Sequence, residues 1–436
     1  MTSEYYALIS DETGSRVLAT PGDAGEMLPQ LNIQESFWWQ DVGPVNRAAR
    51  EQLDITATTL CCFRLIGDEG MAGSRFYYAM ELGEDMANGQ WAEAEALTLP
   101  EQRAIAAEWL TQLPKVGVSR YRPGWRDNAL RWVGDQLAGH GPTLTAAPEQ
   151  VRSWERSSLW RLHTTRGTFY FKAVPEMFGS EPVLSQKLAE WQPAHCPPVL
   201  AIDETRCWMV VGDAGQHSLL RDPDTARWEA ALRRYAGLQI ALTKHIDDLL
   251  SLDLPDRRLE TLPDRINALL ADTVALKNSA VGLSEEEIAT LRAAAPEFEA
   301  ACRELAASGI PASLEHGDFA PGQIMFDDEG EYKFIDWSDN SISFPFFSLL
   351  FFWSELKGEL ADASKARLRL RDAYLEPWTK FAPMPELVRI YELAQRIAPL
   401  HHALIYHHWI LPGMAARWEM ERMLSYYLRI SLKETT

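Results

Sequence analysis

Residues 314–340 gather side chains that could do acid–base or metal chemistry. The stretch LEHGDFAPGQIMFDDEGEYKFIDWSDN holds His316, Asp318, Gln323 and Asp336 among alternating apolar and polar residues. A carboxylate is costly to bury unless a cation or hydrogen-bond donors pair with it. Mg²⁺ is a cation that takes one or two carboxylates and leaves its other positions to phosphate oxygens. The stretch therefore predicts a magnesium-dependent phosphoryl-transfer site.

Phosphoryl transfer requires a base near the accepting hydroxyl, metal ligands, and a cation on the phosphates. QIMF and KFID read as two short strands joined by a turn at Gly330. Such a hairpin can bring Gln323 and Asp336 to one pair of metal ions while Asp318 faces the acceptor.

This stretch resembles the motif of a known enzyme family. HGDFAPGQ followed by FIDW is similar to the H-x-D-x-x-x-x-N and I-D-W or I-D-F motifs of the aminoglycoside phosphotransferase and choline kinase superfamily, which has the protein-kinase-like fold. The resemblance covers about residues 120 to 430. It implies that Asp318 is the catalytic base, that His316 braces the loop, and that Asp336 is the principal metal ligand.

One residue departs from the family pattern. The family has Asn where this chain has Gln323, which keeps the carbonyl oxygen but adds a methylene group. Mg²⁺ demands near-ideal octahedral geometry. The departure therefore puts the geometry of the second metal site in question.

Two upstream segments resemble the nucleotide-binding parts of the same fold. Lys172, in FYFKAV, and Glu181, at the start of the next helix, resemble the ion pair that orients a lysine onto the nucleotide phosphates. WMVVGDAG resembles the hinge, with backbone groups of Met209 and Val211 meeting an adenine. The alternatives are a lysine that snorkels to solvent and an ordinary edge strand.

The predicted phosphate loop is ERSSLW, which contains no glycine. Ser157 and Ser158 are candidates for phosphate contacts through backbone N–H and hydroxyl groups. The alternative is a hairpin turn without a role in binding.

Candidates for the acceptor side come from two later segments. Asp339, in WSD, could reach an amine or hydroxyl of a substrate, or be an ordinary loop acid. His401, in PLHHALIYHHW, could line the acceptor pocket, or be a core histidine. SFPFFSLLFFW, residues 343–353, predicts a buried helix that anchors the site.

The pattern of predicted elements indicates an α+β protein. The expected order begins with a small α/β unit at residues 1–118 and a linker with a helix at 119–145. A small β-rich lobe at 146–221 and a larger helical lobe with the catalytic loop at 222–436 follow.

The first unit resembles the Nudix fold in its order of strands and helices. Aligning the Nudix box on Arg50 and Glu51 puts Ser36 at the glycine and Val42 at the first glutamate. Because most metal-binding acids are missing, a regulatory or docking role fits better than hydrolysis.

Composition limits the classes of partner. The chain has 436 residues, 46% of them hydrophobic, and a net charge of −20, which argues against nucleic acid or an anionic membrane. Five cysteines without a C-x-x-C pair, and an acidic N-terminus unlike a signal peptide, favour the cytoplasm.

The sequence therefore predicts an ATP- and Mg²⁺-dependent phosphotransferase that acts on a hydroxyl of a small molecule. An amino sugar, an amino alcohol or a sugar would fit, and the negative charge is compatible with a cationic acceptor. The alternative is a pseudokinase, impaired at Gln323, that binds nucleotide and acts as a regulatory or scaffold protein.

Overall fold

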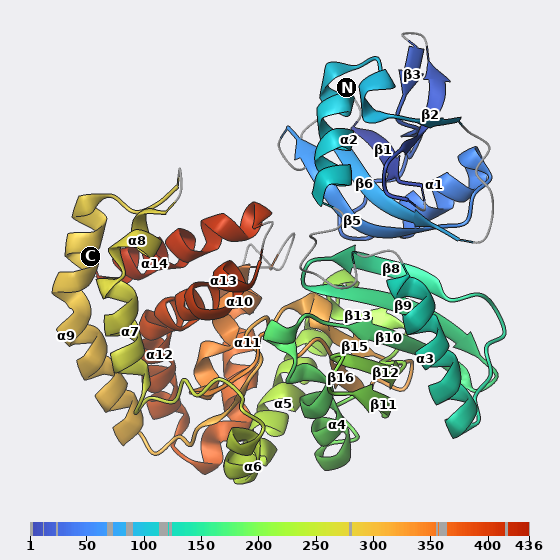
Figure 1. The fold of residues 1–436 in the computed structure, drawn as a ribbon. Coiled ribbons are helices and arrows are strands. Elements are labelled where there is room, and N and C mark those ends of the chain that lie inside the picture. The colour runs from blue at the N-terminus through green and yellow to red at the C-terminus, as the bar shows by residue number, and fades with distance from the viewer. Residues whose placement is uncertain are drawn as a thin grey trace. The chain divides into compact units, whose positions relative to one another are not determined.

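The structure is a computed structural model (Figure 1). It describes residues 3–11, 13–22, 25–67, 73–83, 90–112, 121, 124–278, 281–354, 356, 364–414 and 417–435. The described residues form two units, Met1–Pro175 with Trp208–Val211, and Glu176–Cys207 with Gly212–Thr436. No helix in these ranges is long and apolar enough to cross a bilayer.

The first unit begins with a four-stranded sheet in the order β4-β1-β6-β5. Strand β1 runs parallel to β6, and its last four residues are buried, as expected for a central strand. The elements of this part are β1 Glu4–Ile9, β2 Val17–Gly22, β3 Gly25–Met27, β4 Gln30–Leu31, α1 Gly43–Leu53, β5 Ala57–Ile66, β6 Arg75–Leu82, β7 Gln90–Ala92 and α2 Pro100–Gln112. The Nudix resemblance of residues 1–118 stays a prediction.

The first unit also contains a second sheet, in which β12, β10, β9 and β8 are successive neighbours. Phe171 packs here with Trp125, Trp132 and Trp208, at ring centroid distances of 5.6–6.2 Å. The elements are α3 Trp125–His140, β8 Glu149–Trp154, β9 Ser157–Thr164, β10 Gly167–Ala173 and β12 Trp208–Gly212.

The edge strand β8 is covered by the chain that precedes α1. The Val42 N–H donates to the Val151 carbonyl oxygen at 3.0 Å, and the Ser153 N–H donates to the Gln40 carbonyl oxygen at 3.0 Å. An exposed edge strand presents unpaired backbone groups to other chains. The N-terminal part of the unit therefore protects this edge.

Gln150 of β8 fastens the two sheets through its side chain. Its Nε2 donates to the Thr59 carbonyl oxygen at 2.8 Å, and its Oε1 accepts from the Thr59 N–H at 3.0 Å and from Asn46 Nδ2 at 2.9 Å. Because Gln150 is only 7% exposed, these bonds satisfy polar groups that water does not reach.

The second unit is mainly helical (Figure 1). Helix α12 packs against α7, α9, α11 and α14. The helices are α4 Glu181–Trp191, α5 Thr225–Leu242, α6 Ile246–Ser251, α7 Leu262–Ala271, α8 Thr273–Lys277, α9 Glu285–Ala307, α10 Leu349–Ser354, α11 Ser364–Leu375, α12 Met384–Ile405, α13 Leu411–Gly413 and α14 Met423–Thr435. The strands are β11 Val199–Asp203, β13 His217–Ser218, β14 Ser313–Glu315, β15 Ile324–Phe326, β16 Tyr332–Phe334 and β17 Ser341–Ser343.

The α+β class is confirmed, because strand-rich segments precede a mainly helical part. The single helix predicted for residues 343–353 is wrong. Ser343 ends β17, Pro345–Phe347 is a short 3₁₀ turn, and only α10 is α-helical. Phe344 is extended, with a ψ of 123°, as expected for a residue that precedes proline, so the helix cannot include it.

We expect Gln150→Leu to lower the free energy of unfolding by about 1–3 kcal/mol, because Thr59 and Asn46 would lose their buried partner. Glu149→Gln, on the exposed neighbouring residue, is the control and should stay within about 0.5 kcal/mol of the wild type. Urea denaturation measures both values, and equal midpoints for the two variants would contradict the role given to Gln150.

Candidate active site

The β15–β16 hairpin brings two predicted site residues to one end of the strands. The strands pair antiparallel, as predicted, and Gly330 lies in the turn with a φ of 80°. The Ile335 N–H donates to the Gln323 carbonyl oxygen at 3.0 Å. Gln323 is therefore held across the hairpin from the residue that precedes Asp336.

Asp318 lies next to Gln323. The Gln323 Nε2 donates to Asp318 Oδ2 at 3.2 Å, and the Asp318 side chain is half-buried. The following residue, Phe319, is fully buried and stacks on Tyr235 with 3.8 Å between ring centroids. The buried Phe319 ring therefore fixes the backbone next to Asp318.

His316 connects the Asp318 turn to the segment before Asp336. Its ring is fully buried and lies 4.6 Å from the Trp337 ring, centroid to centroid. Its Nε2 is 2.9 Å from the Ile335 carbonyl oxygen. Because a carbonyl oxygen only accepts, Nε2 carries the proton. This placement agrees with a bracing role for His316.

Asp336 is joined to Glu181 through one hydroxyl group. The Ser338 Oγ lies 2.9 Å from Asp336 Oδ1 and 2.8 Å from Glu181 Oε2. A hydroxyl has one proton, so it donates to one of these carboxylates at a time. Asp336 has a φ of 64°, a left-handed conformation that costs energy outside glycine and is common at functional sites.

Gly317 and Asp339 hold two loops of the site together. Gly317 has a φ of 78°, and a Cβ atom there would lie 2.0 Å from the Asp339 carbonyl oxygen. Only glycine allows this approach. The turn that carries Asp318 therefore rests directly on the loop that follows Asp336.

His401 is a fully buried residue of α12. Its Nε2 lies 3.2 Å from the Ser341 Oγ and 4.0 Å from Glu315 Oε2. Burial holds its pKa well below the usual value, so the ring is neutral. Its predicted share in the acceptor pocket stays a prediction.

The predicted Lys172–Glu181 pair is divided between the two units. Lys172 lies on β10 of the first unit and is 8% exposed, whereas Glu181 opens α4 of the second unit and is 1% exposed. The ion pair stays a prediction. Within its own unit, Glu181 is the residue that Ser338 joins to Asp336.

The other predicted nucleotide contacts lie in the first unit. Ser157 and Ser158 begin β9, and their Oγ atoms accept hydrogen bonds from the indoles of Trp154 and Trp160 at 3.1 and 3.0 Å. Met209 and Val211 lie on β12, and the chain passes into the second unit after Val211. Their contacts with a nucleotide stay predictions.

The residues present fit a magnesium ion that takes its remaining ligands from nucleotide phosphates. Asp336 and Gln323 offer a carboxylate and an amide oxygen, the donor type that Mg²⁺ prefers. No group of three or more His, Cys, Asp or Glu residues in the described chain could hold a metal alone. A protein that supplies only one or two ligands is typical of nucleotide-bound Mg²⁺.

An acidic cavity borders this site within the second unit. It has a volume of about 480 Å³ and includes Ser338, Asp339 and Asn340 in its wall. Its charged lining residues are all acidic: Glu176, Glu204, Asp253 and Asp339. The Asn340 Oδ1 is buried there without a hydrogen-bond partner among the described residues. The lining therefore favours ligand groups that donate hydrogen bonds or carry positive charge.

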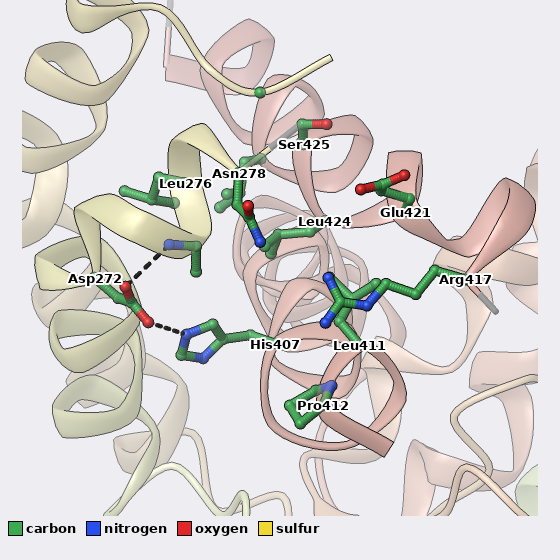
Figure 2. A pocket seen from close by; sticks show the side chains of 13 residues that line it. Asp272, Leu276, Asn278, His407, Leu411, Pro412, Arg417, Glu421, Leu424 and Ser425 are labelled. Atoms are coloured by element: carbon green, nitrogen blue, oxygen red, sulfur yellow. Dashed lines mark hydrogen bonds and ion pairs between the residues drawn. The ribbon is translucent and has the colours of Figure 1, made fainter. Parts of the chain in front are cut away.

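A second cavity, of about 260 Å³, contains none of the predicted site residues (Figure 2). Figure 2 shows His407 hydrogen-bonded to Asp272. Arg417 and Glu421 line the same cavity. The distance from His407 Nε2 to Asp272 Oδ2 is 3.0 Å. This hydrogen bond joins the N-cap residue of α8 to the π-helical segment Tyr406–Ile410 that follows α12.

Sequence reasoning missed three residues that the structure brings to the site, Arg257, Glu315 and Ser338. Glu315 left a signal, because it is a carboxylate in a strand that leads directly into His316. No sequence pattern marks Arg257 or Ser338, since their positions depend on contacts between distant segments.

Solved structures similar to this chain include small-molecule kinases. Choline kinase from Cryptosporidium parvum Iowa II has 11% identity and a TM-score of 0.49, covering 70% of this chain and 95% of that one. A choline/ethanolamine kinase family protein from Mesorhizobium loti has 16% identity and a TM-score of 0.48, covering 71% and 94%. The complex of streptomycin and ATP with APH(2″)-IIa has 14% identity and a TM-score of 0.46, covering 70% and 95%.

No protein-family model matches the sequence, and no curated protein matches it.

We expect Gly317→Ala to lower the free energy of unfolding by about 2–5 kcal/mol, which combines left-handed strain with overpacking against Asp339. Gly330→Ala is the matched control. It has nearly the same φ, 80°, but no atom lies within 4 Å of its added Cβ, so it should cost only about 1–2 kcal/mol. Urea denaturation would refute the close contact if both variants lost the same amount.

Proposed function

We propose that this protein is an ATP-dependent phosphotransferase that passes the γ-phosphoryl group to a hydroxyl of a small molecule. The observation that carries the proposal is the joint placement of Asp318, Gln323 and Asp336 around one hairpin, with Gln323 bonded to Asp318 at 3.2 Å. A base, an amide oxygen and a carboxylate at this spacing are the protein groups that phosphoryl transfer needs.

Asp318 accepts the proton of the acceptor hydroxyl or orients that hydroxyl for attack. Its carboxylate is half-buried and is held by the Gln323 amide. Asp336 and the side-chain amide oxygen of Gln323 would hold Mg²⁺, which would neutralise charge on the nucleotide phosphates. His316 keeps the two segments in register through its bond to the Ile335 carbonyl oxygen.

The proposal also assigns contacts with the nucleotide. Lys172 would contact the α- and β-phosphates with Glu181 as its partner. Ser157 and Ser158 would contribute backbone N–H groups, and Met209 and Val211 would meet the adenine. Preference for ATP over GTP follows from the family resemblance alone.

The acceptor belongs to the amino sugars, amino alcohols or sugars. The acidic cavity supports an acceptor that carries an amine, because its charged lining residues are all carboxylates. Trp409 also lines this cavity and is 37% exposed. An indole face beside carboxylates favours an ammonium group. We place the reaction in the cytoplasm, where ATP is available.

A second candidate is supported by Gln323 itself. Its amide nitrogen is engaged by Asp318, and its side chain is longer than the Asn of the family motif. If this arrangement holds the second metal poorly, the protein is a pseudokinase that binds nucleotide without turnover.

The proposed function is tested by ADP release from ATP with a panel of amino alcohols, amino sugars and sugars. We expect one acceptor to stimulate release and Asp318→Ala to lower the stimulated rate by about 10²–10⁴-fold, the usual contribution of a positioned base. Asp328→Ala is the control, since Asp328 lies in the same hairpin and is 80% exposed. Equal rates for the two variants would reject Asp318 as the base.

Gln323→Asn separates the two candidate functions. In an active phosphotransferase we expect it to lower kcat by about tenfold or more, because the bond to the charged Asp318, about 1.5–3 kcal/mol, is lost. In a pseudokinase the shorter side chain would instead raise turnover. Steady-state kinetics with ATP decides between these outcomes.

A further inference from the structure

A buried arginine and a buried glutamate lie behind the turn that carries Asp318. The Arg257 residue is 1% exposed and Glu315 is fully buried. Neither takes part in the proposed chemistry. Burying a charge is costly unless an opposite charge and hydrogen bonds compensate for it, so this pair calls for an explanation.

The backbone fixes both residues against the same short strand. The Arg257 N–H donates to the Ile342 carbonyl oxygen at 2.9 Å, and the Ile342 N–H donates to the Pro255 carbonyl oxygen at 2.9 Å. On the other side of β17, Glu315 of β14 pairs with Ser341. Arg257 and Glu315 thus come from the two segments that flank β17.

Several polar atoms around this pair have no hydrogen-bond partner among the described residues. They are both terminal nitrogens of Arg257, the Asn340 Oδ1 and the His401 Nδ1. Buried polar groups are nearly always satisfied by protein or by ordered water. Buried donors and acceptors without a protein partner are the groups to which internal water binds.

Two charged residues and two hydrogen-bond donors act on the Glu315 carboxyl group. Burial is the largest influence and raises its pKa to about 7. The Gly317 N–H, the Ser348 hydroxyl and Arg257 favour the ionised form, whereas Asp339 opposes it. The other titratable groups that face it are the neutral His401 of α12, Tyr235 of α5 and Tyr374 of α11.

Arg257 lies within electrostatic range of two acidic residues, Glu315 and Asp339. Burial lowers its pKa to about 10 and the nearby Arg265 acts in the same direction, whereas Glu315 and Asp339 stabilise its charge. The Gly317 N–H donates a hydrogen bond to the Glu315 carboxyl group, and the carbonyl oxygen of Asp339 packs against Gly317. Both carboxylate residues that face Arg257 therefore contact the same glycine, which precedes Asp318.

We propose that Arg257 and Glu315 form a buried, water-bridged charge pair that positions the Gly317–Asp318 turn for phosphoryl transfer. They are positioning residues, since neither touches the reacting groups, and their effect on turnover rests on the proposed function. When Glu315 takes up a proton, the Gly317 N–H and Arg257 lose an anionic partner, and the turn loosens.

Stability and activity then respond to pH in opposite directions. The Glu315 pKa is raised in the folded protein from an ordinary value of 4.5 to about 7. Its contribution to stability is therefore fully present below the ordinary pKa and is lost as the pH rises through about 7. Turnover depends on the ionised pair and should rise over the same pH range.

Infrared difference spectroscopy of the carboxyl group tests the pair without any need for turnover. The protonated carboxyl band that is missing in Glu315→Gln should titrate near pH 7 in the wild type. The midpoint of this band should lie at higher pH in Arg257→Met, which removes the cation. In Arg257→Lys the midpoint should stay close to that of the wild type. A band with the same midpoint in Arg257→Met and the wild type would overturn the pair.

Positioning is tested by amide hydrogen exchange and by kinetics. At pH 8, Glu315→Gln should exchange its amides in residues 313–319 at least tenfold faster than the wild type. Its kcat should fall at least tenfold and lose the rise near pH 7, while the KM for ATP stays within twofold. Unchanged exchange and an unchanged kcat profile would overturn the positioning role.

The two proposals fail in different ways. If no acceptor is turned over but the carboxyl band and the exchange rates respond as expected, the proposed function fails and the pair stands. If Arg257→Met does not fold, the variant with both Arg257→Met and Glu315→Gln should recover folding, because it leaves no uncompensated charge. A double variant less stable than Glu315→Gln and Arg257→Met alike would overturn the pair.

Discussion

The approach of Gly317 to the Asp339 carbonyl oxygen is the contact on which the rest of the site depends. A Cβ atom at Gly317 would meet that oxygen at 2.0 Å, so the two backbones can lie this close only at a glycine. The contact locks the turn that presents Asp318 against the loop that follows Asp336. The contact thereby holds Asp318 and Asp336, which lie on either side of the hairpin, in one site.

Polar groups, rather than apolar packing alone, set the geometry around this contact. His316 and Gln323 each bridge the Asp318 turn to the far side of the hairpin. Ser338 joins Asp336 to Glu181 at the start of α4. Such a network is rigid when its members are satisfied and costly when one is removed. A site built this way keeps its carboxylates at fixed positions before any ligand arrives.

Local patterns in the sequence were sufficient to predict the hairpin and its turn at Gly330. The candidate site residues were visible because His, Asp and Gln stand out beside short apolar strands. Arg257 could not be predicted, because its role depends on pairing with β17, which follows it by a long helical segment. The helix predicted for residues 343–353 failed at its start, because Ser343 pairs with β14 and Phe344 is extended before Pro345.

The most direct test of the central claim is a calorimetric titration of ATP into the wild type and into Asp336→Asn, with and without Mg²⁺. If Asp336 holds the metal on the phosphates, Mg²⁺ should strengthen ATP binding by the wild type at least tenfold and should have little effect on the variant. Equal strengthening by Mg²⁺ in both proteins would contradict the assignment of this hairpin as the magnesium–nucleotide site.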